Sequence, residues 1–457
     1  MLKVSAIGLC LSLLAGCVSL PAPRAPPGSL SFIELTITEA QQAMREQRIS
    51  CEQLTQRYLR RIETYDQADR LNAIIQINPR ALQRARALDE SHAAGGAMQP
   101  LHCIPVILKD NFDTADMPTE AGSIALQGSY PPDDAFIVKR LRDNDAILLA
   151  KSNMAEWAFS PYETVSSTHG ITRNAYALER VPAGSSGGTA SAIAANFGII
   201  GMGTDTGNSI RGPASHLALV GLRPTLGATS RDGIVPLLLN RDIAGPLTRT
   251  VTDNAIVYSV IAGVDPADPL TRTAAGHVKA DYTVYLRPEG LQGARLGVLR
   301  ALMDSGDADF EVLDVMDRAI EELRTAGAVI IDPFVIPDFE RLRQATGFCS
   351  RFRYDLKNYL ATLGDAAPIS SLDEVIKDQR YLPGSAKAMH WAMSVSGAPQ
   401  DQDPPCVDVA GDPRRKQFLT AVLAAMDNAR LDAIIYPSWS NPPRKIGDLK
   451  NPHGNNS

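Results

Sequence analysis

The stretch "GTDTGNSIRGPAS" (Gly203 to Ser215) lies between two apolar runs and carries a serine, Ser209, that could act as a nucleophile. Its small polar residues are typical of a turn, because Gly, Asn, Asp and Ser tolerate the backbone angles that turns require. Such a turn presents successive backbone N–H groups, here those of Thr206, Gly207, Asn208 and Ser209, which could stabilise the oxyanion of an acyl-transfer reaction. The stretch contains no histidine, so the base for Ser209 must come from elsewhere.

The charged neighbours of this turn indicate support rather than catalysis. Asp205 and Arg211 flank the turn, and we expect them to form an ion pair that braces it. His216 is close enough in sequence to suggest a serine–histidine pair, but no acidic residue is placed to orient its ring. We therefore expect His216 to be a packed or capping residue.

A candidate base ends the apolar run "CIPVILKD" (Cys103 to Asp110), which predicts a buried strand. Lys109 at the end of such a strand is desolvated on one side, which lowers its pKa and makes a neutral amine available. Asp110 should point to the opposite face, since side chains alternate along a strand. Taken alone, the pattern is equally typical of a solvated surface lysine.

A third element, "PAGSSGGTASAIAANFG" (Pro182 to Gly198), joins a glycine-rich turn to a helix of small residues. It contains G-x-S-x-G with Ser186 in the middle, the pattern of an α/β-hydrolase nucleophile elbow. That elbow needs a strand directly before the serine, whereas the preceding "YALERVPA" has two charges and a proline that disfavour one. An esterase that uses Ser186 is therefore a weaker alternative.

The motifs "PLHCIPVILKDNFDT", "PAGSSGGTASAIAANFGIIGMGTDTGNSIRGPAS" and "AGPLTRTVTD" resemble the amidase signature family in order and spacing, with a core over about residues 103–262. In that family a lysine follows the first motif and two serines lie 24 residues apart, as Ser185 and Ser209 do here. The resemblance implies a hydrolase of small-molecule linear amides that uses no cofactor. Ser209 would be the nucleophile, Ser185, held by a cis peptide bond, the proton relay, and Lys109 the terminal base.

The chain departs from the family pattern in several places. Asn208, Ala183 and Cys103 stand where the family usually has glycine. Asn accepts left-handed backbone angles better than most residues, so we expect activity to survive. The chain ends at "NPHGNNS", many tens of residues before the family normally ends, which predicts an incomplete C-terminal part. Two further alternatives are an inert binding protein on the same fold and the glutaminase component of a tRNA amidotransferase.

The elements that position these residues alternate between helix and strand patterns. This alternation predicts one large α/β domain, residues 31–457, with a mixed sheet covered by helices on both faces. Ser50 with Gln53 predicts a capping box. "DDAFIVKRLRDNDAILLAKSN" predicts an Asp-capped helix and then a strand at Ala146 to Ala150. The same helix-to-strand unit recurs at residues 310–331 and 416–436.

The segment "NMAEWAFSPYE" (Asn153 to Glu163) contributes to the predicted substrate pocket. Trp157, Phe159 and Tyr162 offer apolar walls, although the same aromatic residues would serve equally well in the core. The sequence does not distinguish a peptide amide from an aryl or fatty amide as the substrate.

The N-terminus predicts export. Lys3 precedes an apolar run, Val4 to Leu14, that is too short to cross a bilayer and has the form of a signal-peptide core, so residues 1–16 are assigned to a signal peptide. "LAGC" (residues 14–17) resembles a bacterial lipobox, which implies a lipid anchor on Cys17 and a Pro-rich tether over residues 17–30. Ser19 favours the outer membrane and hence a periplasmic enzyme. A plain secretory peptide is the alternative.

Export bears on the remaining cysteines. Cys51, Cys103, Cys349 and Cys406 could form up to two disulfides in an oxidising compartment. Three pairings are possible, and buried free thiols are an equally good interpretation.

Composition excludes some functions. The 457-residue chain has a formal net charge of -6 and no run of Lys and Arg with interleaved aromatic residues, so nucleic acid is not an expected partner. HExxH and paired CxxC spacings are absent from the sequence and its seven histidines are scattered, so no metal is expected.

Overall fold

The computed structural model describes residues 30–66, 70–304, 306–345, 347–408 and 411–456. The predicted signal peptide, Cys17 and residues 17–29 of the predicted tether therefore lie outside the described residues. Among the described residues, no helix is both long enough and apolar enough to span a bilayer.

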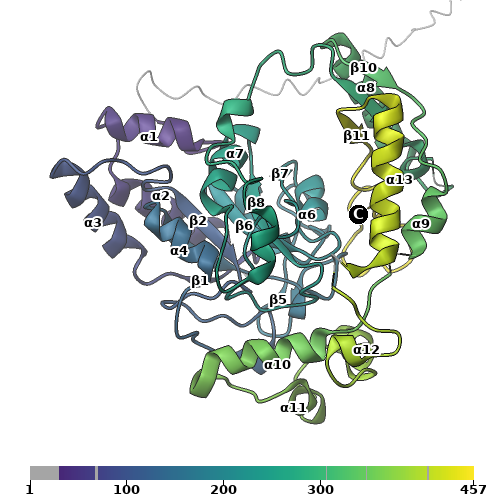
Figure 1. Ribbon diagram of the computed structural model, residues 1–457. Coiled ribbons are helices and arrows are strands. Elements are labelled where there is room, and N and C mark those ends of the chain that lie inside the picture. Colours follow the sequence, from purple (N-terminus) through teal and green to yellow (C-terminus); the bar gives the residue numbers. More distant parts are fainter. Residues whose placement is uncertain (1–29, 67–69, 305, 346, 409–410, 457) are drawn as a thin grey trace, which may run out of the picture.

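A mixed six-stranded sheet forms the centre of the fold, as predicted (Figure 1). In spatial order its strands are β1 (Ile74–Ile77), β3 (Ile147–Ser152), β2 (Pro105–Lys109), β6 (Ile200–Asp205), β8 (Ile243–Thr248) and β7 (Val220–Gly221). Strand β2 runs parallel to both β3 and β6, whereas β1 and β8 are antiparallel to their neighbours. The C-terminal ends of β2 and β6 therefore meet at one edge of the sheet, which places Lys109 beside the start of the 206–209 turn.

Helices from the first part of the chain cover this sheet. They are α1 (Ile37–Arg45), α2 (Cys51–Tyr65), α3 (Ala81–Ala93), α4 (Phe136–Asp143), α5 (Gly187–Ala194), α6 (Arg211–His216) and α7 (Val251–Ile261). The capping box of α2 is confirmed, because the Gln53 N–H donates to Ser50 Oγ at 3.2 Å and the Ser50 N–H donates to Gln53 Oε1 at 3.1 Å. The short strands β4 (Val165–Ser166) and β5 (Gly170–Ile171) form a separate hairpin.

The predicted Asp cap of the helix before β3 is wrong. Helix α4 begins after Ala135 and has no side-chain cap. The carboxylate of Asp134 instead accepts hydrogen bonds from the Ala115 N–H at 2.9 Å and from Arg142 Nε at 2.7 Å. These partners, which lie in another loop and in the last turn of α4, occupy Asp134, and the other aspartate of the pattern, Asp133, accepts from Lys139 Nζ at 2.7 Å.

The two later helix-to-strand units form a second sheet, which the sequence did not predict. Strand β9 (Arg295–Val298) pairs in parallel with β10 (Val329–Ile331) on one side and β11 (Ala433–Ile435) on the other. Helices α8 (Phe310–Thr325) and α13 (Pro413–Ala429) precede these outer strands, and all five elements lie together at the upper right of Figure 1. The helix-to-strand pattern is therefore correct, but its strands join β9 rather than the central sheet.

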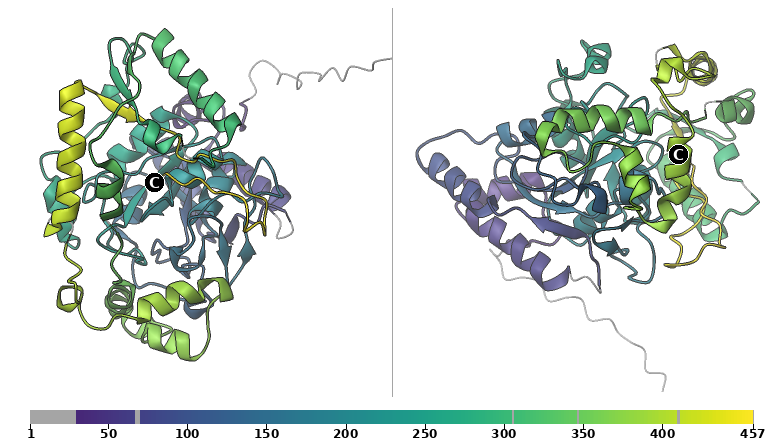
Figure 2. Two further views of the ribbon diagram at one scale, coloured as in Figure 1. Left: turned by 90° about the vertical axis from the view of Figure 1, so that its right-hand side faces the viewer. Right: turned by 90° about the horizontal axis from the view of Figure 1, so that it is seen from below.

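Between β10 and β11 the chain makes a long helical excursion. It contains α9 (Phe339–Ala345), α10 (Phe352–Leu363), α11 (Leu372–Lys377) and α12 (Ala386–Met393). Helices α10, α11 and α12 gather at the bottom of Figure 1, and the left view of Figure 2 also shows this segment below the central sheet. Phe352 and Leu356 of α10 pack on Met154 and Trp157, which follow β3. This contact fastens the excursion to the first part of the chain.

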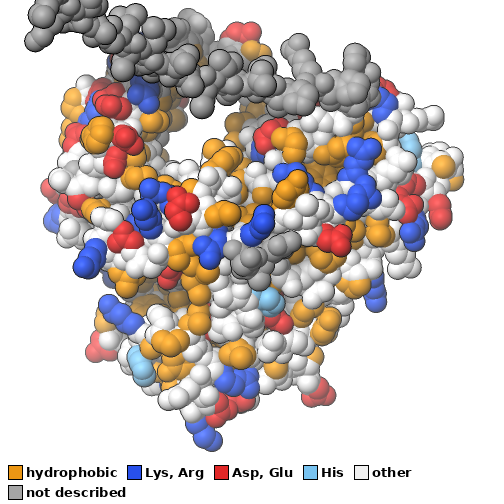
Figure 3. Space-filling view, turned by 180° about the vertical axis from the view of Figure 1, so that it is seen from behind, with side chains coloured by type: hydrophobic (Ala, Val, Ile, Leu, Met, Phe, Trp, Pro, Cys, Tyr) orange, Lys and Arg blue, Asp and Glu red, His pale blue; other side chains and the backbone are white. Residues whose placement is uncertain are grey.

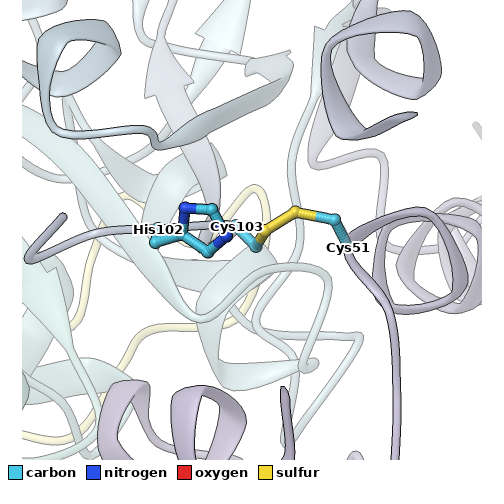
Figure 4. Close-up of side chains that lie close together, drawn as sticks. All are labelled: Cys51, His102 and Cys103. Carbon is cyan, nitrogen blue, oxygen red and sulfur yellow. A yellow bond between two sulfur atoms is a disulfide. The ribbon is translucent and has the colours of Figure 1, made fainter. Parts of the chain in front are cut away.

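All four cysteines among the described residues form disulfides. Cys51 at the start of α2 pairs with Cys103 just before β2, with Cα atoms 5.3 Å apart (Figure 4). Cys349 pairs with Cys406, with Cα atoms 5.7 Å apart, and this bond joins two points 57 residues apart in the helical excursion. The structure thus selects one of the three pairings that the sequence left open.

Acidic and basic side chains are interspersed on the face seen in Figure 3. Hydrophobic side chains lie between them. No patch of one charge dominates this face of the molecule.

Candidate active site

Lys109 ends the fully buried strand β2, and its side chain points at the glycine-rich segment. Its Nζ lies 2.7 Å from Ser185 Oγ and 2.7 Å from Thr204 Oγ1. Burial lowers the pKa of Lys109 to about 7, against the opposing influence of the carboxylates of Asp205 and Asp242. A large fraction of this lysine is therefore neutral near neutral pH and carries a lone pair that can accept a proton.

Asp110 points to the other face of the strand, as expected. Its carboxylate accepts hydrogen bonds from the Glu120 N–H at 3.3 Å and the Gly122 N–H at 3.1 Å. It also lies 3.9 Å from the buried ammonium of Lys151. Asp110 therefore orders a neighbouring loop and does not contact Ser185.

Ser185 is fully buried and follows a cis peptide bond from Gly184, the feature that the family resemblance implied. Its carbonyl accepts a hydrogen bond from the Ala155 N–H at 3.1 Å, and the Gly184 N–H donates to the carbonyl of Pro161 at 3.0 Å. A Cβ on Gly184 would lie 2.4 Å from the carbonyl oxygen of Glu163, so the close approach requires glycine. The 155–163 segment thus holds the backbone that presents Ser185.

The Ser186 hydroxyl is hydrogen-bonded to the backbone of strand β6. Its hydroxyl donates to the Thr204 carbonyl at 3.2 Å, and the Thr204 N–H donates to Ser186 Oγ at 3.4 Å. No strand directly precedes Ser186, which sits just before α5. This geometry lacks the strand–turn–helix arrangement that an α/β-hydrolase elbow requires.

Ser209 lies in the turn after β6 and is 4% exposed. Its carbonyl accepts a hydrogen bond from the Ser186 N–H at 3.3 Å, so the two serine-bearing segments are joined directly. The Thr206 hydroxyl donates to Asp242 Oδ1 at 2.5 Å, and Asp242 Oδ2 accepts from the N–H groups of Leu237 and Leu238. The turn is therefore fixed at both ends by contacts from other parts of the chain.

Asn208 does not have the left-handed backbone angles that the sequence argument considered. Its side-chain amide donates to the carbonyl of Pro161 at 3.1 Å and lies 3.4 Å from that of Gly184. The two other positions where the family usually has glycine do have left-handed backbone angles, with φ 63° at Ala183 and φ 65° at Cys103. Asn208 therefore adds a link between the turn and the Ser185 segment.

Asp205 forms the predicted ion pair with Arg211 and a second one with Arg223. Its oxygens lie 3.1 Å from Arg211 Nε and 2.9 Å from Arg223 Nη1, and it also accepts from the Ile210 N–H at 3.2 Å. Burial by itself would raise the pKa of Asp205, but the two guanidinium groups outweigh burial and hold it below its usual value. This carboxylate therefore stays ionised and anchors both ends of the turn.

We predict that Asp205→Ala lowers the free energy of unfolding by about 3 kcal/mol, because it leaves two partly buried guanidinium groups without their carboxylate. Urea denaturation measures the change. Asp332→Ala, which breaks a more exposed pair with Arg300, is the matched control and should cost at most about 1 kcal/mol. Equal losses in the two variants would contradict the bracing role of Asp205.

His216 is a half-buried, packed residue, as expected. Its ring lies against that of Trp439, with centroids 4.6 Å apart. Burial lowers its pKa to about 4, so it is neutral at physiological pH.

Four residues that the sequence did not predict complete the site. Thr204 receives Lys109 Nζ, and Asn111 Nδ2 donates to the same Thr204 hydroxyl at 3.0 Å. Arg223 and Asp242 hold Asp205 and Thr206 from outside the motif. Asn111 and Thr204 lie inside the quoted motifs. Their polar side chains at the ends of predicted strands could have identified them as site residues.

Cys51, His102 and Cys103 are the single group of potential metal ligands within the described part of the chain (Figure 4). Their two sulfur atoms are bonded to each other, so they are not available as thiolate ligands in this form. His102 Nδ1 lies 3.1 Å from Asp145 Oδ2, which gives the ring a structural partner. This group lies before β2, at the opposite end of that strand from Lys109.

Comparisons with known proteins identify the family of the chain. The sequence profile of the family described as Amidase matches residues 53–457. A probable amidase of Arabidopsis thaliana is 34% identical over 381 residues, covering 80% of this chain and 72% of the relative. A glutamyl-tRNA(Gln) amidotransferase component from Caldanaerobacter subterraneus subsp. tengcongensis is 37% identical over 333 residues, covering 71% of this chain and 66% of the relative.

Solved structures of similar proteins have the same fold. The native peptide amidase from Stenotrophomonas maltophilia superposes with a TM-score of 0.77 at 36% sequence identity, covering 90% of this chain and 87% of that one. The similarity therefore extends well beyond the glycine-rich and serine motifs.

Proposed function

Because this chain belongs to the amidase signature family of amide hydrolases, we propose that it cleaves linear carboxamides through an acyl-enzyme on Ser209, with Ser185 and Lys109 as the proton relay. The observation that carries the proposal is the 2.7 Å contact between Lys109 Nζ and Ser185 Oγ in a fully buried setting. A neutral amine in hydrogen-bond reach of a serine is the arrangement that general-base catalysis needs.

The proposed reaction begins with proton transfer along the relay. Neutral Lys109 takes the proton of Ser185, Ser185 takes that of Ser209, and Ser209 Oγ attacks the amide carbonyl carbon. The backbone N–H groups of residues 206–209 stabilise the resulting oxyanion, which is worth about 3 kcal/mol for one such donor in other enzymes. The relay then runs backwards and protonates the leaving nitrogen as the C–N bond breaks.

Water completes the cycle on the acyl-enzyme. The same relay removes a proton from the water molecule, whose oxygen attacks the ester carbonyl, and returns the proton to Ser209 as the acid product leaves. No step in this sequence needs a metal or a redox cofactor. The substrate is a small-molecule amide.

Mass spectrometry after fluorophosphonate treatment tests this proposal. We expect one adduct per chain, located on Ser209, and no adduct in Ser209→Ala. An adduct on Ser186 would favour the esterase alternative, and a folded wild type that takes no adduct would favour an inert binding protein. Ser186→Ala is the matched control, since it removes an adjacent buried hydroxyl without touching the relay.

One observation supports the glutaminase alternative, namely that several relatives are described as components of glutamyl-tRNA(Gln) amidotransferases. We favour a free-standing amidase, because the predicted export signal would separate the chain from cytosolic tRNA. Hydrolysis of simple amides by the purified chain alone supports the amidase. Activity limited to glutamine in the presence of partner proteins would contradict it.

We also propose that the chain works in the periplasm, anchored to the outer membrane through Cys17. The two disulfides support this location, because structural disulfides persist in oxidising compartments and are rare in the cytosol. We predict that Cys17→Ser abolishes incorporation of labelled palmitate and releases the protein from the membrane fraction. Retention of both label and membrane association in this variant would contradict the anchor.

A further inference from the structure

A cavity of about 670 Å³ lies between the 155–165 segment and residues 382–391, which include most of α12. Its walls include Phe159, Tyr162, Val165, Leu382 and Trp391. This volume is within the usual range for small-molecule sites, which are mostly apolar. The cavity contains neither Ser185 nor Ser209.

The walls of the cavity are held in place by buried polar contacts. Glu156, which is 2% exposed, accepts hydrogen bonds from the Leu382 N–H at 2.8 Å and the Ser385 hydroxyl at 2.6 Å. This carboxylate therefore ties the first wall to the second. On the far side, the Ser350 hydroxyl donates to the Trp391 carbonyl at 3.3 Å. The cavity is thus a preformed site.

The first wall of the cavity is also the segment that holds the two serines. The Ala155 N–H donates to the Ser185 carbonyl, and the Pro161 carbonyl accepts from the Gly184 N–H and from Asn208 Nδ2. The first wall therefore contacts Ser185 and the residue directly before each serine, so a ligand in the cavity lies against the segment that positions the proposed reaction centre.

We propose that this cavity binds the apolar part of the amide substrate while the scissile amide lies at Ser209. The inference rests on the proposed function and names its substrate class, which is a neutral amide with an aromatic or branched aliphatic group. The walls carry three charged side chains. The Glu156 carboxylate is already engaged by hydrogen bonds from Ser167, Leu382 and Ser385. Lys387 and Glu163, which remain, have opposite charges, so the walls do not favour an ionic substrate.

Two neutral primary amides test the inference in the full chain: acetamide, and N-acetyl-leucyl-phenylalaninamide as the extended apolar probe. We expect Trp391→Ala to raise KM for the extended amide roughly tenfold with little change in kcat, and to leave kcat/KM for acetamide unchanged, because only the extended amide contacts the lost ring. Trp391→Phe should restore most of the binding. Phe310→Ala removes a 70% exposed ring on α8 and is the matched control.

The outcomes separate the inference from the function on which it rests. If the wild type hydrolyses acetamide but Trp391→Ala leaves KM for the extended amide unchanged, or weakens both amides equally, the cavity does not bind substrate and the proposed function stands. If the wild type hydrolyses neither amide and takes no fluorophosphonate, the proposed function fails and the inference fails with it. A selective rise in KM, reversed by Trp391→Phe, supports both.

Discussion

Ser209→Ala lowers kcat for amide hydrolysis by about 10⁵- to 10⁶-fold, the size of loss seen when the nucleophile of another serine hydrolase is removed. The physical reason is that the methyl group cannot form the acyl-enzyme, while the oxyanion-binding turn and the substrate contacts remain. Initial-rate kinetics measure the loss. The variant should retain wild-type stability, because the backbone contacts of residues 206–209 do not use the lost hydroxyl.

The control for this prediction is Ser186→Ala. Its hydroxyl is bonded to the Thr204 backbone, so its loss should cost about 1 kcal/mol of stability and far less activity than the loss of Ser209. Residual activity of Ser209→Ala within tenfold of wild type would overturn the assignment of the nucleophile. A larger loss in Ser186→Ala than in Ser209→Ala would transfer that role to Ser186.

Lys109→Met lowers kcat by roughly 10³- to 10⁴-fold, because it removes the general base and leaves the Ser185 hydroxyl without an acceptor. Methionine has a similar length and no charge, so the core stays filled. The pKa of Lys109 is lowered to about 7 chiefly by burial, which means that the folded protein disfavours the charged lysine. Replacing this lysine with an apolar side chain should therefore not reduce the free energy of unfolding at pH 6.

The pH dependence of kcat/KM tests whether Lys109 acts as a base. The neutral amine is the active form, so in the wild type kcat/KM should rise about tenfold per pH unit below pH 7 and level off above it. The lysine has its ordinary pKa of 10.5 when unfolded, so its contribution to stability rises with pH between about 7 and 10.5. Lys109→Met should lose the rise in activity near pH 7. A profile that falls through pH 7, or a variant that keeps the rise, would contradict the assignment.

Much of the site was predictable because it is built from short motifs next to strand ends. The spacing of Ser185 and Ser209, the strand before Lys109 and the Asp205–Arg211 pair all depend on residues close in sequence or fixed by alternation along a strand. The structure brings these elements together where parallel strands β2 and β6 end side by side. It also forms the cis bond before Ser185 that the resemblance implied.

What the sequence could not predict depends on contacts between distant segments. From outside the motif, Arg223 donates to the Asp205 carbonyl and Asp242 accepts from the Thr206 hydroxyl, and nothing in their local pattern indicates this role. Strand β11 pairs with β9, which lies more than a hundred residues earlier, so a helix-to-strand pattern alone does not say which sheet it joins. Only part of the expected aromatic pocket is present. Phe159 and Tyr162 line the cavity, whereas Trp157 packs in the core.

The helical excursion between β10 and β11 has a consequence for how this scaffold can be re-engineered. The chain enters this excursion from one outer strand of the small sheet and leaves it at the other outer strand. The Cys349–Cys406 disulfide joins two points within it that lie 57 residues apart. The excursion carries the Leu382 and Trp391 wall but neither proposed catalytic serine. An exchange of residues 349–406 between homologous chains would therefore transplant a preference for one substrate over another while leaving the reaction chemistry with its host.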